Sequence, residues 1–294
     1  MDNIAKIIGE EIRYLRKKAG LTQIQLAQGT VTQAQISKIE RGEVLPLCTT
    51  LYEIAETLGL DVNYFYNLAY TPRFDYVTEV KKQIRDAIRK RNYTEVESMI
   101  NDESNSPTFR IGINHQFLLW HKGIVEFYVY KNVEKSLELL FEALYYGKHK
   151  ELPILKLQQI EILNSIGIIY NETEDYLKSI EVYKEAFVKL QDLPQHDLHI
   201  EIRLCYSMAK SLHKINEFQQ SLTYSQRGLN LCVNEEILYL LGELHHITAQ
   251  SFEQLENKKN AYDHFIKAKN LFEIEGRFHF ADIANRSIIE LLGE

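Results

Sequence analysis

Apolar residues recur three or four positions apart along the first 66 residues, the spacing that places them on one face of a helix. Residues 4–18 show it clearly, with isoleucines at 4, 8 and 12 between charged side chains, and Ala19-Gly20 ends that helix. Four shorter helices are expected to begin near Thr22, Thr32, Thr49 or Thr50, and Asp61. The pattern therefore predicts a small domain of five helices.

The second and third of these helices form a tight pair within residues 21–42. Thr22 and Thr32 are suitable N-caps, because a threonine hydroxyl can accept a hydrogen bond from a free amide in the first helical turn. Gly29 ends the first helix of the pair, since glycine adopts a left-handed conformation without steric cost. The side chains expected to face the core are Leu21, Ile24, Leu26, Ala27, Ile36 and Ile39.

The remaining face of the third helix is polar in a way that suits contact with DNA bases. Glutamine can bond adenine through two hydrogen bonds, serine accepts several partners, and lysine reaches guanine or phosphate. The polar side chains of this face are not expected to be buried in a core. These side chains are Gln33, Gln35, Ser37 and Lys38.

Residues 21–42 resemble the helix-turn-helix of the lambdoid phage repressors and the wider XRE family. The likeness runs through Leu21-Thr22-Gln23, Leu26-Ala27, Gln33, Ile36-Ser37-Lys38-Ile39-Glu40 and Gly42. It implies that Gln23 braces the third helix and touches a phosphate, while Gln33, Ala34, Ser37 and Lys38 lie at or near base edges. A helical hairpin with an ordinary polar face is the alternative. The expected DNA-binding residues are Arg16, Lys17, Thr22, Gln23, Thr32, Gln33, Ala34, Gln35, Ser37, Lys38 and Arg41.

Charge complicates this interpretation. The net charge is −7, of which residues 1–72 carry −1, so the first domain is not basic as a whole. A local patch can still hold phosphates, and two copies in a dimer would hold more. The patch is expected to comprise Arg13, Arg16, Lys17 and Lys18, with Lys38 and Arg41 nearby.

Beyond Thr71-Pro72, which interrupts the helical pattern, the chain is expected to be helical to its end and repetitive. Small residues seven positions apart recur in segments that begin at Ser136, Ser179, Ser221 and Ala261, at spacings of 43, 42 and 40 residues. The pattern resembles tetratricopeptide helix pairs, with residues 76–101 as an earlier pair and 278–292 as a closing helix. It predicts a curved solenoid with a concave inner surface, and a general helical bundle is the alternative.

The predicted organisation is thus all-α, with a helix-turn-helix domain at 1–70, a linker at 71–75 and a repeat domain at 76–294. This combination resembles the peptide-responsive quorum-sensing regulators of Gram-positive bacteria, the Rap, Rgg, NprR, PlcR and PrgX group. The resemblance implies a cytoplasmic homodimer that binds a near-palindromic site on double-stranded DNA and a short, reimported signalling peptide. It favours activation of transcription over repression. A Rap-type adaptor acting on a signalling partner is the alternative.

The same resemblance assigns peptide-binding residues. Asn164 lies where the group uses an asparagine to bond the peptide backbone, and Ser207 replaces a second such asparagine. Arg89 and Arg91 replace two lysines that face the acidic end of the peptide, which keeps the charge and adds a planar fork suited to carboxylate. Further candidates are, by alignment, Tyr66, Glu243 and Phe280 and, by helix phase alone, Tyr206 and His246.

Other chemistry has less support. Cys48, Cys205 and Cys232 are far apart and form no Cys-x-x-Cys pair, so reduced thiols are expected, with redox sensing by one of them as the alternative. His196 and His199 lack an evident third ligand, and no metal or cofactor is expected. No phosphate-binding glycine loop or nucleophile–base set indicates an enzyme. No signal peptide or apolar run of membrane-spanning length is evident.

Overall fold

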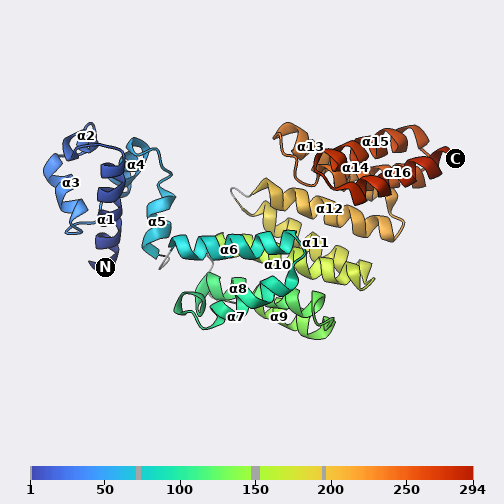
Figure 1. Ribbon diagram of the computed structural model, residues 1–294, viewed down its shortest axis with the longest axis horizontal. Helices are drawn as coiled ribbons and strands as arrows, with labels where there is room; N and C mark the ends of the chain where they lie inside the picture. The colour runs from blue at the N-terminus through green and yellow to red at the C-terminus, as the bar shows by residue number, and fades with distance from the viewer. Residues whose placement is uncertain (1, 71–73, 147–152, 194–196, 294) are drawn as a thin grey trace. The chain divides into compact units, whose positions relative to one another are not determined.

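The computed structural model describes residues 2–70, 74–146, 153–193 and 197–293, and the regular elements within these ranges are all helical (Figure 1). The all-α prediction is confirmed. The chain forms two compact units, Met1–Asn114 and His115–Glu294. This division lies beyond the predicted linker, of which 71–73 fall outside the described residues, so the predicted domain limits remain a prediction.

The first unit begins with the five expected helices. Thr22 caps α2, where its hydroxyl accepts a hydrogen bond from the Gln25 amide, while the Gln25 side chain accepts one from the Thr22 amide. Thr32 caps α3 in the same way through the Gln35 amide. The helices are α1 (Asp2–Lys18), α2 (Gln23–Ala27), α3 (Gln33–Glu40), α4 (Cys48–Thr57) and α5 (Asn63–Tyr70).

Two local predictions for this region are wrong. Helix α4 begins at Cys48, after Leu47, and no side chain caps it, so Thr49 and Thr50 are not its N-caps. Thr50 is instead buried inside the helix. Ile24 is 71% exposed and does not face the core, because the five-residue helix α2 presents only one face, which Leu26 and Ala27 occupy.

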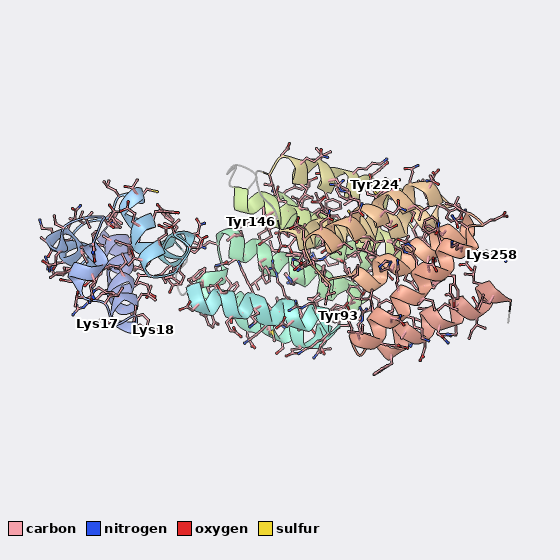
Figure 2. The ribbon with its side chains drawn as sticks, turned by 90° about the horizontal axis from the view of Figure 1, so that it is seen from above. Lys17, Lys18, Tyr93, Tyr146, Tyr224 and Lys258 are labelled. Atoms are coloured by element: carbon pink, nitrogen blue, oxygen red, sulfur yellow. The ribbon has the colours of Figure 1, made fainter. Side chains whose placement is uncertain are left out.

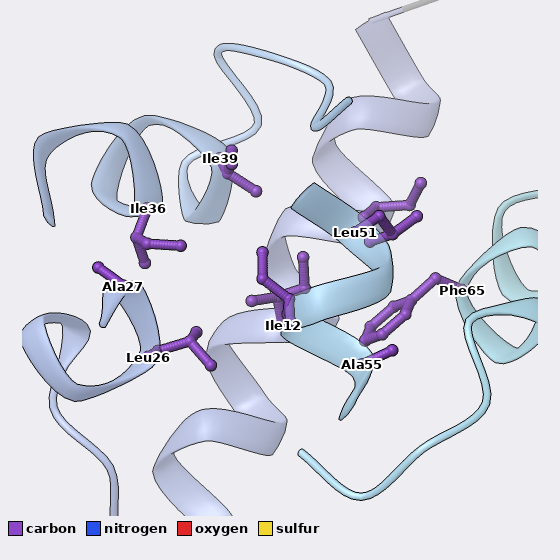
Figure 3. Close-up of a cluster of buried hydrophobic side chains, with 10 residues drawn as sticks. Ile12, Leu26, Ala27, Ile36, Ile39, Leu51, Ala55 and Phe65 are labelled. Atoms are coloured by element: carbon purple, nitrogen blue, oxygen red, sulfur yellow. The ribbon is translucent and has the colours of Figure 1, made fainter. Parts of the chain in front are cut away.

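Helices α1 to α5 enclose a single apolar cluster, shown in Figure 3. Glycines allow α1 to approach the end of α3 closely. A Cβ atom at Gly9 would overlap the Ile39 carbonyl, and one at Gly42 would lie 2.7 Å from the Lys6 Cα. The buried residues are Ile8, Ile12, Leu26, Ala27, Ile36, Ile39, Leu51, Ile54, Ala55 and Phe65.

The remainder of the first unit contains α6 (Phe74–Arg89), α7 (Tyr93–Ser104) and the short helix η1 (Pro107–Phe109). Helices α6 and α7 form the early helix pair predicted for residues 76–101. Asn92 caps α7 by accepting a hydrogen bond from the Glu95 amide, and the Tyr76 hydroxyl of α6 bonds the buried Glu103 carboxylate of α7.

Helix α8 (Gly112–Tyr128) begins a series of antiparallel pairs that makes up the second unit (Figure 1). The final helix α16 has the limits predicted for a closing helix. The others are α9 (Val133–Tyr145), α10 (Pro153–Glu172), α11 (Tyr176–Gln191), α12 (Leu198–Lys214), α13 (Phe218–Asn234), α14 (Leu241–Gln254), α15 (Lys258–Ile274) and α16 (Phe278–Leu292).

The repeated small residues lie in the second helix of each pair, α9, α11, α13 and α15, and all are buried. Three of them also bond the preceding helix. The Ser136 hydroxyl donates to the Gly123 carbonyl at 2.6 Å, Ser179 to Gly167 at 2.9 Å, and Ser221 to Ala209 at 2.9 Å. The repeat inferred from sequence is therefore a repeated packing contact, in which a small residue brings each second helix against the first.

Gly167 provides a test of this packing. A Cβ atom at this position would overlap the buried ring of Tyr183 on α11, so Gly167→Ala is expected to lower the free energy of unfolding by about 1–3 kcal/mol, the usual cost of overpacking. Urea unfolding followed by the fluorescence of Trp120, the single tryptophan, measures the change. Adding Tyr183→Leu should recover part of the loss. Equal stability of Gly167→Ala and the wild type would contradict the packing account.

Candidate DNA-reading helix and ligand-binding layer

Helix α3 presents the polar face that the sequence predicts. Ile36 and Ile39 are buried in the core, whereas Gln33, Ala34, Gln35 and Lys38 are exposed and Ser37 is half-buried. Thr22 and Thr32 are exposed caps at the starts of α2 and α3.

A chain of hydrogen bonds fixes the start of this face. The Arg16 guanidinium donates to both Glu40 oxygens, from Nε to Oε1 at 2.5 Å and from Nη2 to Oε2 at 2.9 Å. Gln23 Nε2 donates to Glu40 Oε2 at 2.9 Å, and Gln33 Nε2 donates to Gln23 Oε1 at 2.7 Å. The bracing role expected of Gln23 thus has a definite geometry: the Gln33 amide is oriented with its nitrogen inward, which leaves its oxygen to accept a bond.

Arg16 corrects the sequence analysis. Its side chain is 11% exposed, and its Nη1 also donates to the Leu21 carbonyl at 2.7 Å, so it is a buried structural residue and not a phosphate contact. Burial by itself would raise the pKa of Glu40, but the hydrogen bonds from Arg16 and Gln23 hold that pKa below its usual value. Sequence analysis assigned no role to Glu40, because helix periodicity does not reveal a partner 24 residues away.

Helices α1 to α5 are called the head from here on, and its exposed cations are therefore fewer than predicted. Lys17 and Lys18 project from the end of α1, as Figure 2 shows, and Lys38 lies on α3. Arg41, just after α3, is exposed but engaged: its guanidinium bonds the Glu43 carboxylate and the Ser37 hydroxyl.

In the second unit, the first helices of successive pairs, α10, α12 and α14, lie side by side and form one layer, called here the first-helix layer. Polar contacts cross it. Asn171 of α10 donates to the Ser211 hydroxyl of α12 at 2.8 Å, and Lys210 of α12 pairs with Glu172 at 3.0 Å. Helix α8 joins α10 through Trp120, whose indole nitrogen donates to the Ser165 hydroxyl at 2.8 Å.

Three side chains of this layer carry buried polar atoms that lack a hydrogen-bond partner among the described residues. They are Asn164 Oδ1 on α10, Glu243 Oε2 on α14 and His246 Nε2 on α14. A buried polar atom without a partner costs roughly 1–3 kcal/mol of desolvation free energy. All three belong to residues expected to bind peptide. Two buried oxygens of the first unit, Glu103 Oε2 and Asn114 Oδ1, also lack a partner, so the role of these three atoms in peptide binding remains a prediction.

Other predicted peptide residues are engaged within the protein. Ser207 is buried and its hydroxyl has the Tyr183 phenol as a partner within the protein, and its role in peptide binding remains a prediction. Tyr206 is partly buried against the apolar cluster around Leu244. Tyr66 belongs to α5, where it packs on the core and donates to the Cys48 sulfur at 3.4 Å, and its part in peptide binding remains a prediction.

Glu243 and Phe280 share a partner that the sequence analysis missed. Arg277 Nη1 lies 2.6 Å from Glu243 Oε1, and its guanidinium stacks 4.5 Å from the Phe280 ring centre and 5.0 Å from that of Phe272. Arg277 directly precedes the closing helix, but nothing in its spacing indicates these contacts. The arrangement holds one oxygen of Glu243 and leaves the other unbonded.

Arg89 and Arg91 lie at the turn between α6 and α7. Arg89 is exposed and pairs with Asp86, and Arg91 is exposed with a left-handed backbone, φ 57°. Both belong to the first compact unit and Asn164 to the second, so a groove that they share remains a prediction.

The described residues give no metal site, and of the three cysteines Cys205 and Cys232 are buried while Cys48 is exposed. No group of three or more His, Cys, Asp or Glu side chains there could hold a metal ion. His196 lies outside the described residues, and His199 bonds Asp197. Burial raises the pKa of Cys205 to about 12 and that of Cys232 to about 11, so neither forms a thiolate at neutral pH.

None of the described helices has the length and apolar content needed to cross a membrane.

A helix-turn-helix head followed by stacked helix pairs defines a class of DNA-binding regulators with a helical sensing body. Residues 12–65 match the helix-turn-helix family, and residues 81–287 match the RNPP family C-terminal domain. This protein belongs to the RNPP family, since the second match spans more than half of the chain. The chain is also 37% identical over 59 residues to the uncharacterized HTH-type transcriptional regulator y4dJ of Sinorhizobium fredii, and this match covers 20% of this chain and 77% of that protein.

Solved structures share the fold at low identity. PlcR of Bacillus thuringiensis, in complex with the peptide PapR7 and DNA, has a TM-score of 0.84 at 22% identity, over 95% of this chain and 99% of that one. ComR of S. thermophilus, with DNA and its signalling peptide ComS, has a TM-score of 0.65 at 17% identity, over 97% and 99%. The Streptococcus dysgalactiae pheromone receptor Rgg2 has a TM-score of 0.64 at 14% identity, over 96% and 99%. These relatives are regulators and receptors and not enzymes, as the sequence predicts.

The Arg16–Glu40 pair generates a first prediction for the head. Arg16→Met leaves Glu40 buried without its cation, so it should destabilise the head by about 3–5 kcal/mol. Hydrogen–deuterium exchange of α1 and α3 amides should then accelerate. Arg13→Met, at an exposed position of the same helix, is the matched control: Arg13 acts on Glu40 through its charge without a hydrogen bond, so the loss should be much smaller. A combined Arg16→Met/Glu40→Met variant should recover much of the loss, and unchanged exchange in Arg16→Met would contradict a structural role.

The pair of His245 and His264 generates a second prediction, which concerns the stability of the fold as a function of pH. Burial and the neighbouring His264 and Lys267 lower the pKa of His245 to about 4, and its Nδ1 lies 2.9 Å from that of His264. The unfolded chain, with a histidine pKa of about 6.5, therefore binds more protons between these values, so stability should fall as pH drops from about 6.5 to 4.

His245→Gln should remove at most about 1.4 kcal/mol per pH unit of this dependence, the contribution of one proton. Urea unfolding at a series of pH values measures it. His279→Gln, at an exposed position, is the control. A variant with the same slope as the wild type would show that His245 is not kept neutral by its surroundings.

Proposed function

We propose that this protein is a peptide-responsive transcription regulator. Its head binds double-stranded DNA through α3, and its repeat domain binds a short signalling peptide. The relatives solved with both DNA and a signalling peptide support this assignment, because they share the fold over nearly the whole chain.

The hydrogen-bond chain from Arg16 through Glu40 and Gln23 to Gln33 carries the DNA part of the proposal. It fixes an exposed amide at the start of a polar helix, where the amide can contact adenine through two bonds or accept a single bond from a base donor. Gln35 and Lys38 are exposed on the same helix and Lys17 is exposed at the end of α1, and we propose that they contact bases and phosphates.

The unbonded atoms of Asn164, Glu243 and His246 support the peptide part. An extended peptide has N–H groups along its backbone that need acceptors, and side-chain oxygens of solenoid helices can supply them. Arg89 and Arg91 would then take an acidic side chain or the free C-terminus of the peptide.

In this proposal the protein acts in the cytoplasm as a homodimer that binds a near-palindromic DNA site. The two α3 helices would then lie about 34 Å apart, or a multiple of that distance. Peptide binding activates transcription by favouring one arrangement of the chain over another. Only a difference in peptide affinity between the two arrangements can shift their populations.

Replacing Gln33 and Lys38 tests the DNA part. Duplexes that bind the wild-type protein are first selected from a randomised library. Gln33→Ala with Lys38→Ala should weaken binding to them by about 1–3 kcal/mol for each side chain that no longer bonds a base, measured by fluorescence anisotropy. Gln28→Ala, an exposed glutamine outside α3, is the control. An unchanged sequence preference in the double variant would contradict the assignment of α3.

Asn164→Leu tests the peptide part. It removes the unbonded oxygen, so the free protein should gain about 1–3 kcal/mol of stability. The rise in Tm that a short synthetic peptide selected on the wild type produces should be reduced or abolished. Asn171→Leu on the same helix is the matched control and should destabilise, because Asn171 bonds Ser211. A variant that keeps the full peptide-induced shift would exclude Asn164 from the site.

A further inference from the structure

Arg41, the cation that directly follows α3, is bonded by its own chain through all three guanidinium nitrogens. Its Nε lies 2.5 Å from Glu43 Oε1 and its Nη2 lies 3.1 Å from Oε2, while Nη1 donates to the Ser37 hydroxyl. Paired forks of this kind are the strong form of the arginine–carboxylate contact. The side chains of Arg41 and Glu43 are about half exposed, so the pair lies on the surface that α3 presents.

The backbone holds Glu43 in place for this contact. Gly42 adopts a left-handed conformation, φ 69°, and the Gly42 and Glu43 amides donate to the Ile39 and Lys38 carbonyls at 2.9 and 3.0 Å. These two bonds are the glycine-dependent ending of a helix. Gly42 also abuts Lys6 of α1, where a Cβ would not fit. The position of Glu43 at the end of α3 is therefore fixed by the fold and not by the ion pair alone.

Two consequences follow for a DNA-binding surface. The carboxylate offsets the charge of Arg41, and it lies close enough to Lys38 to interact with it as well, so the cations of this surface attract phosphates less strongly. Ser37 accepts a hydrogen bond from Arg41, which leaves its own proton free to donate outward. A serine so oriented suits a base acceptor, such as N7 or O6 of guanine or O4 of thymine.

We propose that Glu43 is a specificity-determining residue: by holding Arg41 across Ser37 it weakens binding to DNA of arbitrary sequence and orients Ser37 toward a base. Glu43 acts through Arg41 and Ser37 and is thus a positioning residue. The inference rests on the proposed function of the head. Non-specific binding depends almost entirely on phosphate electrostatics, whereas binding to a preferred site also includes base contacts. Removal of the Glu43 carboxylate should therefore strengthen non-specific binding more than binding to a preferred site.

The test compares the full-length wild type with Glu43→Gln on two duplexes, one of randomised sequence and one selected with the wild type from a random library. Anisotropy titrations at several salt concentrations give the affinities and their salt slopes. Glu43→Gln should bind the randomised duplex several-fold more tightly, with a slope steeper by about one per head as Arg41 gains a phosphate contact. The ratio of selected to randomised affinity should fall.

Matched variants separate this local effect from net charge. Glu53→Gln removes an exposed carboxylate from α4 and should leave both affinities close to those of the wild type. Arg41→Gln combined with Glu43→Gln should cancel the gain on the randomised duplex. Equal behaviour of Glu43→Gln and Glu53→Gln, or an unchanged ratio, would overturn the role of Glu43 alone. A wild type that selects no duplex would overturn the proposed DNA binding and this inference with it.

Discussion

The ion pair of Arg16 and Glu40 is the interaction on which the head of this molecule depends. Charges taken from water are stable only when their hydrogen-bonding capacity is met, and here the Leu21 carbonyl and Gln23 complete what the pair leaves open. Because Gln23 in turn holds Gln33, the bonds that close the core also position the first side chain of α3. Folding and the proposed base recognition in the head share one set of hydrogen bonds.

The repeat domain depends on a different constraint, the close approach of two helices at a small residue. Ser136, Ser179 and Ser221 meet it with a hydroxyl that bonds a carbonyl of the neighbouring helix, and Ala261 meets it by size alone. Polar groups of the first-helix layer add to this stacking, since Ser211 of α12 bonds both Asn171 and Ser179. Asn164 and Glu243 carry buried oxygens that take no part in it, and their contact with a peptide remains a proposal.

Periodicity and caps predicted the helices well, because both act over a few residues. The caps Thr22 and Thr32 and the limits of the closing helix agree with the structure. Predictions failed where local signals do not decide the outcome. Helix α4 begins at Cys48 without a side-chain cap, and Ile24 is exposed because Leu26 and Ala27 fill the buried face of α2.

The candidate sites show the same division. A helical pattern tells which face a residue occupies but not which partner meets it there. Arg16 on α1 was expected to contact DNA, but its guanidinium bonds Glu40 inside the fold. Ser207 on α12 bonds the Tyr183 phenol, a partner that the spacing did not indicate. Lys38 and Gln33 are exposed on α3, as the sequence indicates. Their contacts with DNA remain predictions.

The bond between Trp120 and Ser165 has a practical consequence. The chain has one tryptophan, and its indole is hydrogen-bonded to the residue that follows Asn164. Emission from a buried indole changes with the polarity and bonding around it. The tryptophan fluorescence of the unlabelled protein therefore reports on changes around Ser165 of α10, and helices α1 to α5 add no tryptophan signal.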